Sequence, residues 1–282
     1  MFKIKKYIPD IVVAIILIAG IGLLAYPTIG DYINALHSSK AIGSYVEKTK
    51  DLSKEEKENL LREAREYNES LVGKVNRYYL NEEEKKRYAH ILDITKTGIM
   101  AYVEIPKLNI YMPVYHGTDE GVLRIAAGHL PGSSLPVGGE NTHSLISGHR
   151  GLPSAKLFTD IDKLKKGDLF FIHVFDEVLA YKVNQIKIVL PDDVETLEIE
   201  KGKDYVTLIT CTPYGVNSHR LLVRGERTVY KQSESKIEDM IKKNNLKYIM
   251  LTAGVILALI GMTVLVSVFL IKRRKRRKLN EK

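Results

Sequence analysis

Residues 205–225 read YVTLITCTPYGVNSHRLLVRG, and this stretch decides the fold. An apolar, β-branched run leads into Cys211, turn-forming residues follow it, and a second strand-like run ends the stretch. The pattern predicts a β-hairpin whose loop is longer than the tightest turns. If the loop is residues 212–218, Cys211 faces His219 or Arg220 across the hairpin. The hairpin then presents a thiol at the end of one strand and an arginine at the start of the next.

The sequence before this hairpin has the same strand character. Short apolar runs separated by turn signals predict strands at Ile99–Ile105, Asn109–Val114, Thr142–Ser147, Leu169–Val174 and Val178–Val189. A long loop rich in Gly, Pro and Ser is expected over Gly128–Glu140, and a helical turn over Ser154–Leu164. Many short strands at regular intervals predict a mainly β domain, a closed barrel or a sandwich, over residues 99–230.

Residues 32–98 precede this domain and are expected to be partly helical. The polar composition of residues 32–50 indicates a linker. Capping-box patterns predict one helix starting at Ser53 and a second starting at Asn81, with an irregular join over Leu71–Leu80. Such helices fit a stalk, a partner-binding face or a cover over a site, and composition does not choose among these.

Two apolar segments lie near the ends of the chain. Residues 248–271 contain no charge, and about 20 such residues suffice to span a membrane, so a transmembrane helix is expected there. Residues 11–30 are also apolar but contain Pro27. This segment is a signal anchor within residues 1–31 or a cleaved signal peptide. No clean cleavage site follows it, which favours the anchor.

The net charge of +9 is concentrated beside the apolar segments. Lysines among the first six residues contribute +3 and residues 272–282 contribute +7, which leaves −1 on the rest of the chain. This distribution is typical of membrane topology and not of a nucleic-acid-binding face. The positive-inside rule predicts a plasma-membrane protein with both termini in the cytoplasm, residues of about 32–246 outside, and residues 231–247 as a charged linker.

Cys211 is the only cysteine in the chain, so it cannot form an internal disulfide. It is either a buried structural residue or a nucleophile. A thiol nucleophile needs a base, and the acyl group it attacks needs a stabilised oxyanion. Arg220 lies within reach of the thiol region, whereas Arg224 lies about 13 Å further along the strand at ~3.3 Å per residue.

The base is expected among the histidines. His149 stands in Ser-Gly-His-Arg-Gly just past an expected strand, where small neighbours favour a side chain presented into a cleft. His116, His143 and His219 are alternatives, and position alone does not select one of them. Paired His/Cys spacings typical of a metal site are absent from the sequence, and we expect neither a metal nor a cofactor.

Residues 207–211, TLITC, resemble the TLxTC signature of sortases, the cysteine transpeptidases of Gram-positive cell surfaces. The continuation over residues 212–225 and the segments 135–143 and 147–158 resemble the pilus-assembling class, class C. The resemblance covers roughly residues 99–228, together with the layout of two anchors.

The resemblance implies a fold, a reaction and a set of site residues. The fold is a closed sortase β-barrel of about eight strands. Cys211 is the nucleophile, His149 the acid/base partner and Arg220 the oxyanion or substrate stabiliser. The family cleaves an LPxTG-like sorting signal after Thr through a thioester, and class C joins the product to a lysine amine of the next pilin. The implied partners are therefore pilins or other surface proteins that bear such a signal.

Class C members usually carry a lid with an Asp-Pro-aromatic motif before the barrel. Here residues 75–81 read VNRYYLN, which lacks that motif. Either Tyr78 or Tyr79 takes the place of the aromatic residue, or the lid is absent or anchored differently. Residues 231–247 contain no LPxTG-like motif, so the C-terminal apolar segment is expected to be a stop-transfer anchor and not a sorting signal.

Two other functions fit the sequence. A sortase of a different class would attach surface proteins to peptidoglycan. An inert scaffold would use a sortase-like barrel to bind pilins without chemistry. The presence of cysteine, histidine and arginine together argues against the scaffold.

Overall fold

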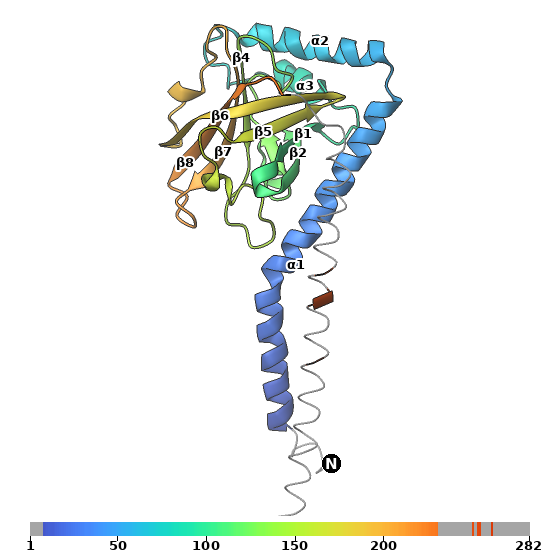
Figure 1. Cartoon of the computed structure of the whole chain (residues 1–282), viewed down its shortest axis with the longest axis vertical. Helices are drawn as coiled ribbons and strands as arrows, with labels where there is room; N and C mark the ends of the chain where they lie inside the picture. The colour runs from blue at the N-terminus through green and yellow to red at the C-terminus, as the bar shows by residue number, and fades with distance from the viewer. Residues whose placement is uncertain (1–7, 231–249, 251–252, 255–260, 262–282) are drawn as a thin grey trace, which may run out of the picture. The chain divides into compact units, whose positions relative to one another are not determined.

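The computed structural model of the chain describes residues 8–230 and residues 250, 253, 254 and 261. The chain divides into one unit of residues 1–29 and 232–282 and another of residues 30–231, and the strands that the structure describes all belong to the second unit (Figure 1). The elements in chain order are α1 (Ile8–Asp51), α2 (Lys54–Leu71), α3 (Glu82–His90), β1 (Ile99–Ile105), η2 (Pro106–Leu108), β2 (Ile110–His116), α4 (Glu120–Leu123), β3 (Ala127–His129), β4 (Thr142–Ser147), η3 (Ile161–Lys163), β5 (Leu169–Val174), β6 (Glu177–Val189), η4 (Glu195–Leu197), β7 (Asp204–Thr212) and β8 (His219–Arg227).

The strands form a closed barrel in the order β1-β2-β3-β4-β7-β8-β6-β5, with β5 paired back to β1. The pairs β2/β3 and β4/β7 are parallel and the others are antiparallel. The prediction of a closed barrel of about eight strands is confirmed. The three-residue strand β3 overlaps the start of the segment expected to be a loop, because so short a strand leaves no alternating pattern.

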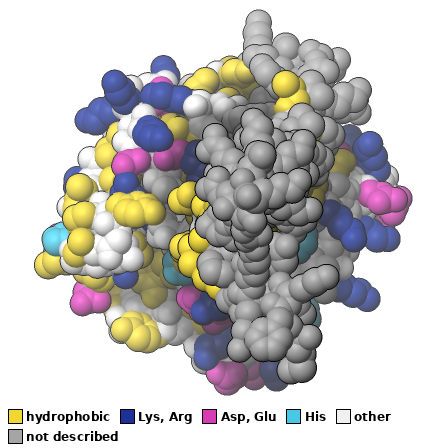
Figure 2. Space-filling model, turned by 90° about the horizontal axis from the view of Figure 1, so that it is seen from below, with side chains coloured by type: hydrophobic (Ala, Val, Ile, Leu, Met, Phe, Trp, Pro, Cys, Tyr) yellow, Lys and Arg dark blue, Asp and Glu magenta, His cyan; other side chains and the backbone are white. Residues whose placement is uncertain are grey.

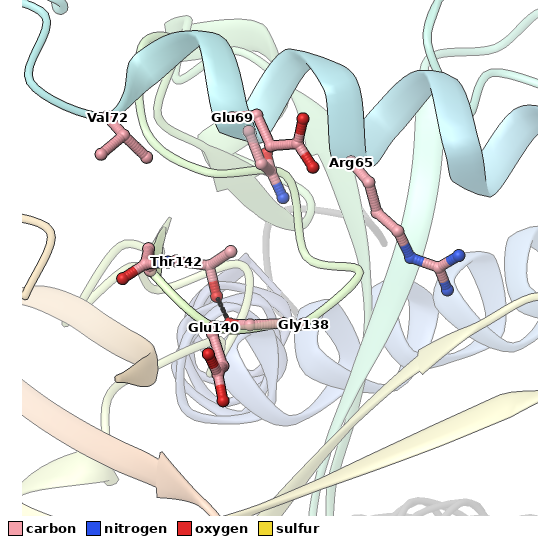
Figure 3. A pocket seen from close by; sticks show the side chains of 9 residues that line it. Arg65, Glu69, Val72, Gly138, Glu140 and Thr142 are labelled. Atoms are coloured by element: carbon pink, nitrogen blue, oxygen red, sulfur yellow. Dashed lines mark hydrogen bonds between the residues drawn. The ribbon is translucent and has the colours of Figure 1, made fainter. Parts of the chain in front are cut away.

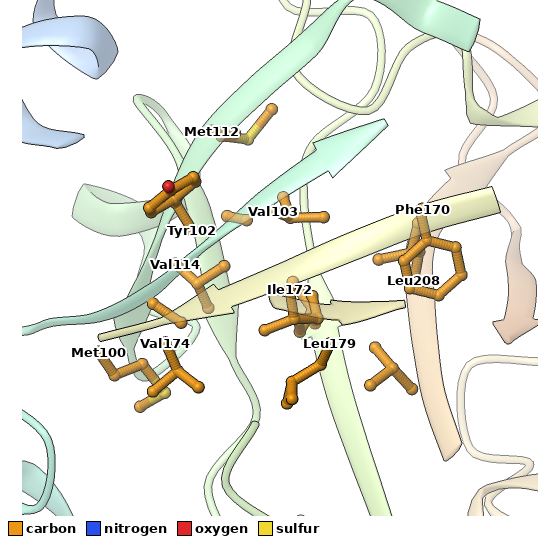
Figure 4. Close-up of a cluster of buried hydrophobic side chains, with 14 of the residues drawn as sticks. Met100, Tyr102, Val103, Met112, Val114, Phe170, Ile172, Val174, Leu179 and Leu208 are labelled. Atoms are coloured by element: carbon orange, nitrogen blue, oxygen red, sulfur yellow. The ribbon is translucent and has the colours of Figure 1, made fainter. Parts of the chain in front are cut away.

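Apolar side chains fill the inside of the barrel, among them Val103, Val114, Ile172 and Leu208 (Figure 4). Every residue of β1 is buried, because α1 covers the outer face of this strand. The ring of Tyr45 on α1 lies 6.4 Å from the ring of Tyr102. The continuous apolar character of β1 therefore reflects burial on both faces.

A second, smaller apolar cluster lies on the outer face of β4, β7 and β8. Leu208 belongs to the barrel core, so the neighbouring side chain of Ile209 points to the opposite face. The members of this outer cluster are Leu145, Leu197, Ile209 and Leu222, with Tyr78, Leu130 and Val189 packed against them. The outer cluster marks the face of the sheet on which Cys211 lies.

The two predicted capping boxes are present, at Ser53 before α2 and at Asn81 before α3. The helix α2 lies across one end of the barrel (Figure 1). It is fixed there by Asn68, whose buried side chain accepts a hydrogen bond from Leu135 N at 2.7 Å and donates one to Leu135 O at 3.1 Å. The irregular segment that joins the two helices, residues 72–81, therefore begins at a helix that is fixed to the barrel.

Residues 32–50, whose composition indicated a linker, are helical and belong to α1. Within the described residues one helix, Ile15–Asp51, is long and apolar enough to cross a membrane by length and composition. This agrees with an N-terminal anchor. The predicted second anchor over residues 248–271 and the basic tail fall outside the described residues, apart from the four isolated positions named above.

Candidate active site

The hairpin register places Cys211 opposite Arg220. β7 and β8 pair without a register shift from Tyr205↔Glu226 to Thr212↔His219. Directly opposed residues of an antiparallel pair point to the same face, with Cβ atoms about 5 Å apart. The thiol and the guanidinium therefore share one face at the loop end of the hairpin. Of the two partners considered from sequence, the structure selects Arg220.

His149 is brought to the same level by the parallel pairing of β4 with β7. Ser147 pairs with Ile209 at the end of β4. The register continues beyond the strand, because Gly148 N donates to Ile209 O at 3.0 Å and Thr210 Oγ1 donates to Gly148 O at 2.7 Å. His149 therefore stands level with Cys211, on the segment that continues from β4, and paired strands lie about 4.8 Å apart.

The three residues form a row across β8, β7 and the segment just past the end of β4. Cys211 follows Ile209 by two residues, so it points outward like the outer cluster. All three side chains are partly exposed. The residue before His149 is Gly148, and the ring of Phe158 packs against it. A Cβ at Gly148 would lie 2.6 Å from that ring. This contact allows only glycine and fixes the backbone from which the imidazole projects.

Glu120, on the short helix α4, contacts the imidazole. Its Oε2 lies 3.2 Å from His149 Nε2, and its Oε1 accepts a hydrogen bond from Arg124 Nε at 2.8 Å. The hydrogen bond from Arg124, and secondly that from His149, lower the pKa of the Glu120 carboxyl, and the carboxylate accepts a hydrogen bond from His149 Nε2–H. In this tautomer Nδ1 carries no proton and can accept a hydrogen bond. Sequence reasoning missed Glu120, because no local pattern links residues 29 positions apart.

Arg150 ties the residues around His149 to those around Cys211. Its guanidinium contacts the Asp162 carboxylate and donates to Thr212 Oγ1 at 3.3 Å. It also lies 5.9 Å from the centroid of the Tyr214 ring in the loop after β7. The Arg150 side chain is only 10% exposed, so water competes little with the contacts that join the loop after β4 to the loop after β7.

The other candidate histidines lie elsewhere. His116 is hydrogen-bonded to the carbonyl oxygens of Gly98 and Ile91. His143 is buried between Glu198 O and Thr207 Oγ1, and burial lowers its pKa to about 4. His219 pairs with Thr212 and so lies on the face opposite Cys211. The row therefore contains only His149 among the four candidates.

Tyr78 and Tyr79 differ sharply in their surroundings. Tyr78 packs on the outer cluster, and its hydroxyl accepts a hydrogen bond from Arg77 at 2.8 Å. Arg77 is itself buried and donates to Leu197 O at 2.7 Å, which ties this segment to the barrel. Burial raises the pKa of Tyr78. The side chain of Tyr79 is 85% exposed, so of the two tyrosines only Tyr78 covers the face that carries Cys211.

A pocket of about 330 Å³ lies away from this row. It is formed by α2 and the loop before β4 (Figure 3), and its lining includes Arg65, Glu69, Glu140 and Thr142. Thr142 begins β4, about 23 Å from His149 at ~3.3 Å per residue. The pocket is therefore separate from the Cys211 site.

The described residues contain no group of three or more His, Cys, Asp or Glu side chains that could hold a metal ion. On the face drawn in Figure 2, the described Lys and Arg side chains stand in several separate places, interspersed with Asp and Glu. The described residues visible on that face therefore present no continuous basic surface of the kind that binds nucleic acid.

Comparison with known proteins accords with this geometry. A model of the sortase domain matches residues 103–228, which include all three residues of the row. The crystal structure of sortase C1 from Streptococcus agalactiae is 48% identical, with a TM-score of 0.66, covering 68% of this chain and 100% of that one. A sortase C structure from Streptococcus pneumoniae is 46% identical, with a TM-score of 0.62, covering 69% and 99%.

Among curated proteins, sortase A of Bacillus anthracis is 32% identical over 133 residues, which are 47% of this chain and 61% of that protein. The chain thus spans about three fifths of the length of curated relatives that it matches. The solved structures at 42–48% identity are class C sortases matched over nearly their whole length. This chain is therefore a member of the sortase family, similar in sequence and fold to its class C.

Proposed function

We propose that the chain is a membrane-anchored class C sortase that cleaves an LPxTG-like sorting signal after Thr and joins it to a lysine amine of another pilin subunit. The observation that carries the proposal is the row of Cys211 on β7, Arg220 on β8 and His149 just past the end of β4. The printed description of the Streptococcus pneumoniae structure refers to pilin substrate specificity. That of one Streptococcus agalactiae enzyme refers to a pilus island.

The first half-reaction forms a thioester. His149 Nδ1 takes the thiol proton, and the Cys211 sulfur attacks the threonine carbonyl carbon. The negative charge that develops on the carbonyl oxygen lies beside the Arg220 guanidinium. The imidazolium then gives its proton to the glycine nitrogen as the Thr–Gly bond breaks, and the glycine amine leaves.

The second half-reaction reverses the proton path. The incoming lysine amine attacks the thioester carbonyl, His149 accepts the proton that the amine loses, and the Cys211 thiolate departs. The product is an isopeptide bond between threonine and lysine. Glu120 at Nε2 keeps the imidazole in one tautomer and supports its charged form while it holds the transferred proton within each half-reaction.

Hydrogen bonds to the neighbouring loop support the oxyanion role that we propose for Arg220. Its Nη1 donates to Asn217 O at 3.3 Å and to His219 O at 3.2 Å. A guanidinium has five N–H donors, so these contacts leave others for the substrate. Arg224, on the same strand, is already paired with Glu200 at 2.9 Å and lies opposite Thr207.

We further propose that residues 72–81 act as the lid, with Tyr78 as the covering aromatic residue. Tyr78 takes its position from the outer cluster and from Arg77. Opening the lid would expose the strand face beside Cys211 to an extended peptide.

The test is acceptor choice by the full chain in detergent micelles. A fluorescent LPxTG-type peptide is offered with either a pilin-derived lysine peptide or a peptidoglycan-type oligoglycine amine. The proposal predicts a ligated isopeptide product with the lysine peptide, and none from the Cys211→Ala protein. Ligation to oligoglycine alone would instead assign the chain to peptidoglycan anchoring. Release of the signal by neither route, with the lid opened by Tyr78→Ala, would favour the inert scaffold.

A further inference from the structure

The loop that carries His149, residues 148–160, is held at several places within the barrel unit. Phe158 N donates to His149 O at 3.1 Å and Gly151 N donates to Thr159 Oγ1 at 3.1 Å, so the two arms of the loop are bonded to each other. Between them, Leu152 and Ala155 form an isolated β-bridge. Ser154 therefore sits in a tight turn, and a shift of this turn is transmitted to the backbone of His149 through the paired arms.

The helix α1 rests on this turn. At Gly30 a Cβ would lie 2.9 Å from both Cα and O of Ser154, so the two backbones meet at a distance that only glycine allows. One residue later, Asp31 Oδ1 accepts a hydrogen bond from Lys156 N at 2.9 Å. The helix thus contacts main-chain atoms of the turn at Ser154 and at Lys156, on both sides of Ala155.

The contact residues lie on the same helix as the apolar segment. α1 runs unbroken from Ile8 to Asp51, and its C-terminal part is fixed to the barrel by Tyr45, whose hydroxyl donates to Met100 O at 3.1 Å and accepts from Phe175 N at 3.0 Å. The helix is therefore anchored to the barrel independently of the turn, and this lets it act as a support.

We propose that Gly30 and Asp31 are positioning residues for the transpeptidation reaction: they hold the His149 loop so that the imidazole stays level with Cys211. The inference rests on the proposed function, since it assigns His149 the role of acid and base. It adds that the catalytic geometry depends on the helix that bears the N-terminal apolar segment. Displacement of a reacting group by about 1 Å can cost on the order of 100-fold in rate.

The experiment compares variants of the full chain in detergent micelles. Gly30→Val puts a side chain against the Ser154 backbone, whereas Gly43→Val is the matched control, because a Cβ at Gly43 on the same helix meets nothing within 4 Å. Asp31→Ala removes the acceptor for Lys156 N, and Asp31→Asn keeps an oxygen there. Active sites are counted by stoichiometric labelling of Cys211 with a small thiosulfonate reagent, and rates are expressed per labelled site.

We expect kcat per labelled site to fall roughly 10- to 100-fold for Gly30→Val and Asp31→Ala, with KM changed less than kcat. Gly43→Val and Asp31→Asn should stay within about threefold of wild type. A purely structural role would lower the number of labelled sites or the Tm, but not the rate per site.

Wild-type rates in Asp31→Ala, or an equal loss in Gly43→Val, would overturn the inference. If Gly30→Val fails to fold, the comparison of Asp31→Ala with Asp31→Asn decides alone. If the wild-type chain itself transfers no acyl group, the proposed function has failed. If all variants are as active as wild type, only the positioning role of Gly30 and Asp31 has failed.

Discussion

At the scale of single residues, the site depends on contacts that reach each side chain from a different element. Cys211 and Arg220 face each other through the hairpin, whereas Glu120 reaches His149 from α4. The residue opposite Cys211 could be predicted from sequence to be one of two, His219 or Arg220, because the register of a hairpin depends on its short loop. The Glu120 contact could not be predicted, since it depends on how the chain between residues 120 and 149 folds back.

Replacing Glu120 should slow the reaction without removing it. Glu120→Gln keeps an oxygen near His149 Nε2 but loses the charge that favours the imidazolium. We expect kcat to fall about tenfold, within the range for losing a partner that orients a histidine ring. Glu63→Gln, an exposed change on α2, is the control.

The pH dependence of this difference follows from the lowered pKa of Glu120. The Glu120 carboxylate is fully ionised above the ordinary glutamate pKa of about 4.3, and its charge is lost as the pH falls through the lowered pKa. Wild type and Glu120→Gln should therefore differ at neutral pH and converge in strongly acidic solution. Equal pH–rate profiles for the two proteins would remove Glu120 from the site.

Arg220 and Arg224 offer a matched pair on one strand. Arg220→Ala should lower kcat by 10²- to 10³-fold, the cost typical of losing an oxyanion donor. Arg224→Ala should leave the rate per labelled Cys211 within about threefold, because Arg224 pairs with Glu200 away from the row. Steady-state kinetics with the LPxTG-type peptide measure both, and similar losses in the two variants would contradict the assignment.

At the scale of elements, the alternating pattern of β7 separates the barrel core from the site. Leu208 points inward and Ile209 outward, and the outward positions form the outer cluster below Tyr78. Most strands could be predicted because they alternate or are continuously apolar between turn residues. β3 could not, and neither could the parallel pairing of β4 with β7, which joins segments more than fifty residues apart.

The lid proposal predicts different behaviour for adjacent tyrosines. Tyr78→Ala removes a ring packed on the outer cluster and should speed the labelling of Cys211 by a bulky thiol reagent several-fold. Tyr79→Ala removes a ring that is 85% exposed and should leave the labelling rate unchanged. Labelling is followed by intact mass, and equal rates in the three proteins would argue against a lid at Tyr78.

At the scale of the whole molecule, α1 belongs both to the apolar N-terminal segment and to the fold of the barrel unit. Its buried side chains at Ser38, Ile42, Tyr45 and Thr49 follow helical spacing. Polar residues surround this narrow buried stripe, so the overall composition of residues 32–50 resembles that of a linker. Sequence composition therefore obscured a helix that periodicity alone could have indicated.

The docking of α1 can be tested through one hydroxyl group. Tyr45→Phe leaves Phe175 N without its acceptor in a buried place, and we expect a loss of about 1–3 kcal/mol in the free energy of unfolding. Tyr79→Phe, at an exposed position, should cost nothing measurable. Denaturant unfolding of the full chain gives both values, and an unchanged midpoint for Tyr45→Phe would show that α1 is not part of the cooperative unit.

The central claim is that Cys211 forms a thioester with the sorting signal. Intact and peptide-level mass spectrometry of the full chain, quenched in acid after incubation with an LPxTG-type peptide, tests it directly. The account predicts an acyl adduct ending in threonine on Cys211, more abundant in Tyr78→Ala and absent from Cys211→Ala. No adduct in either wild type or Tyr78→Ala, or an adduct that persists in Cys211→Ala, would contradict it.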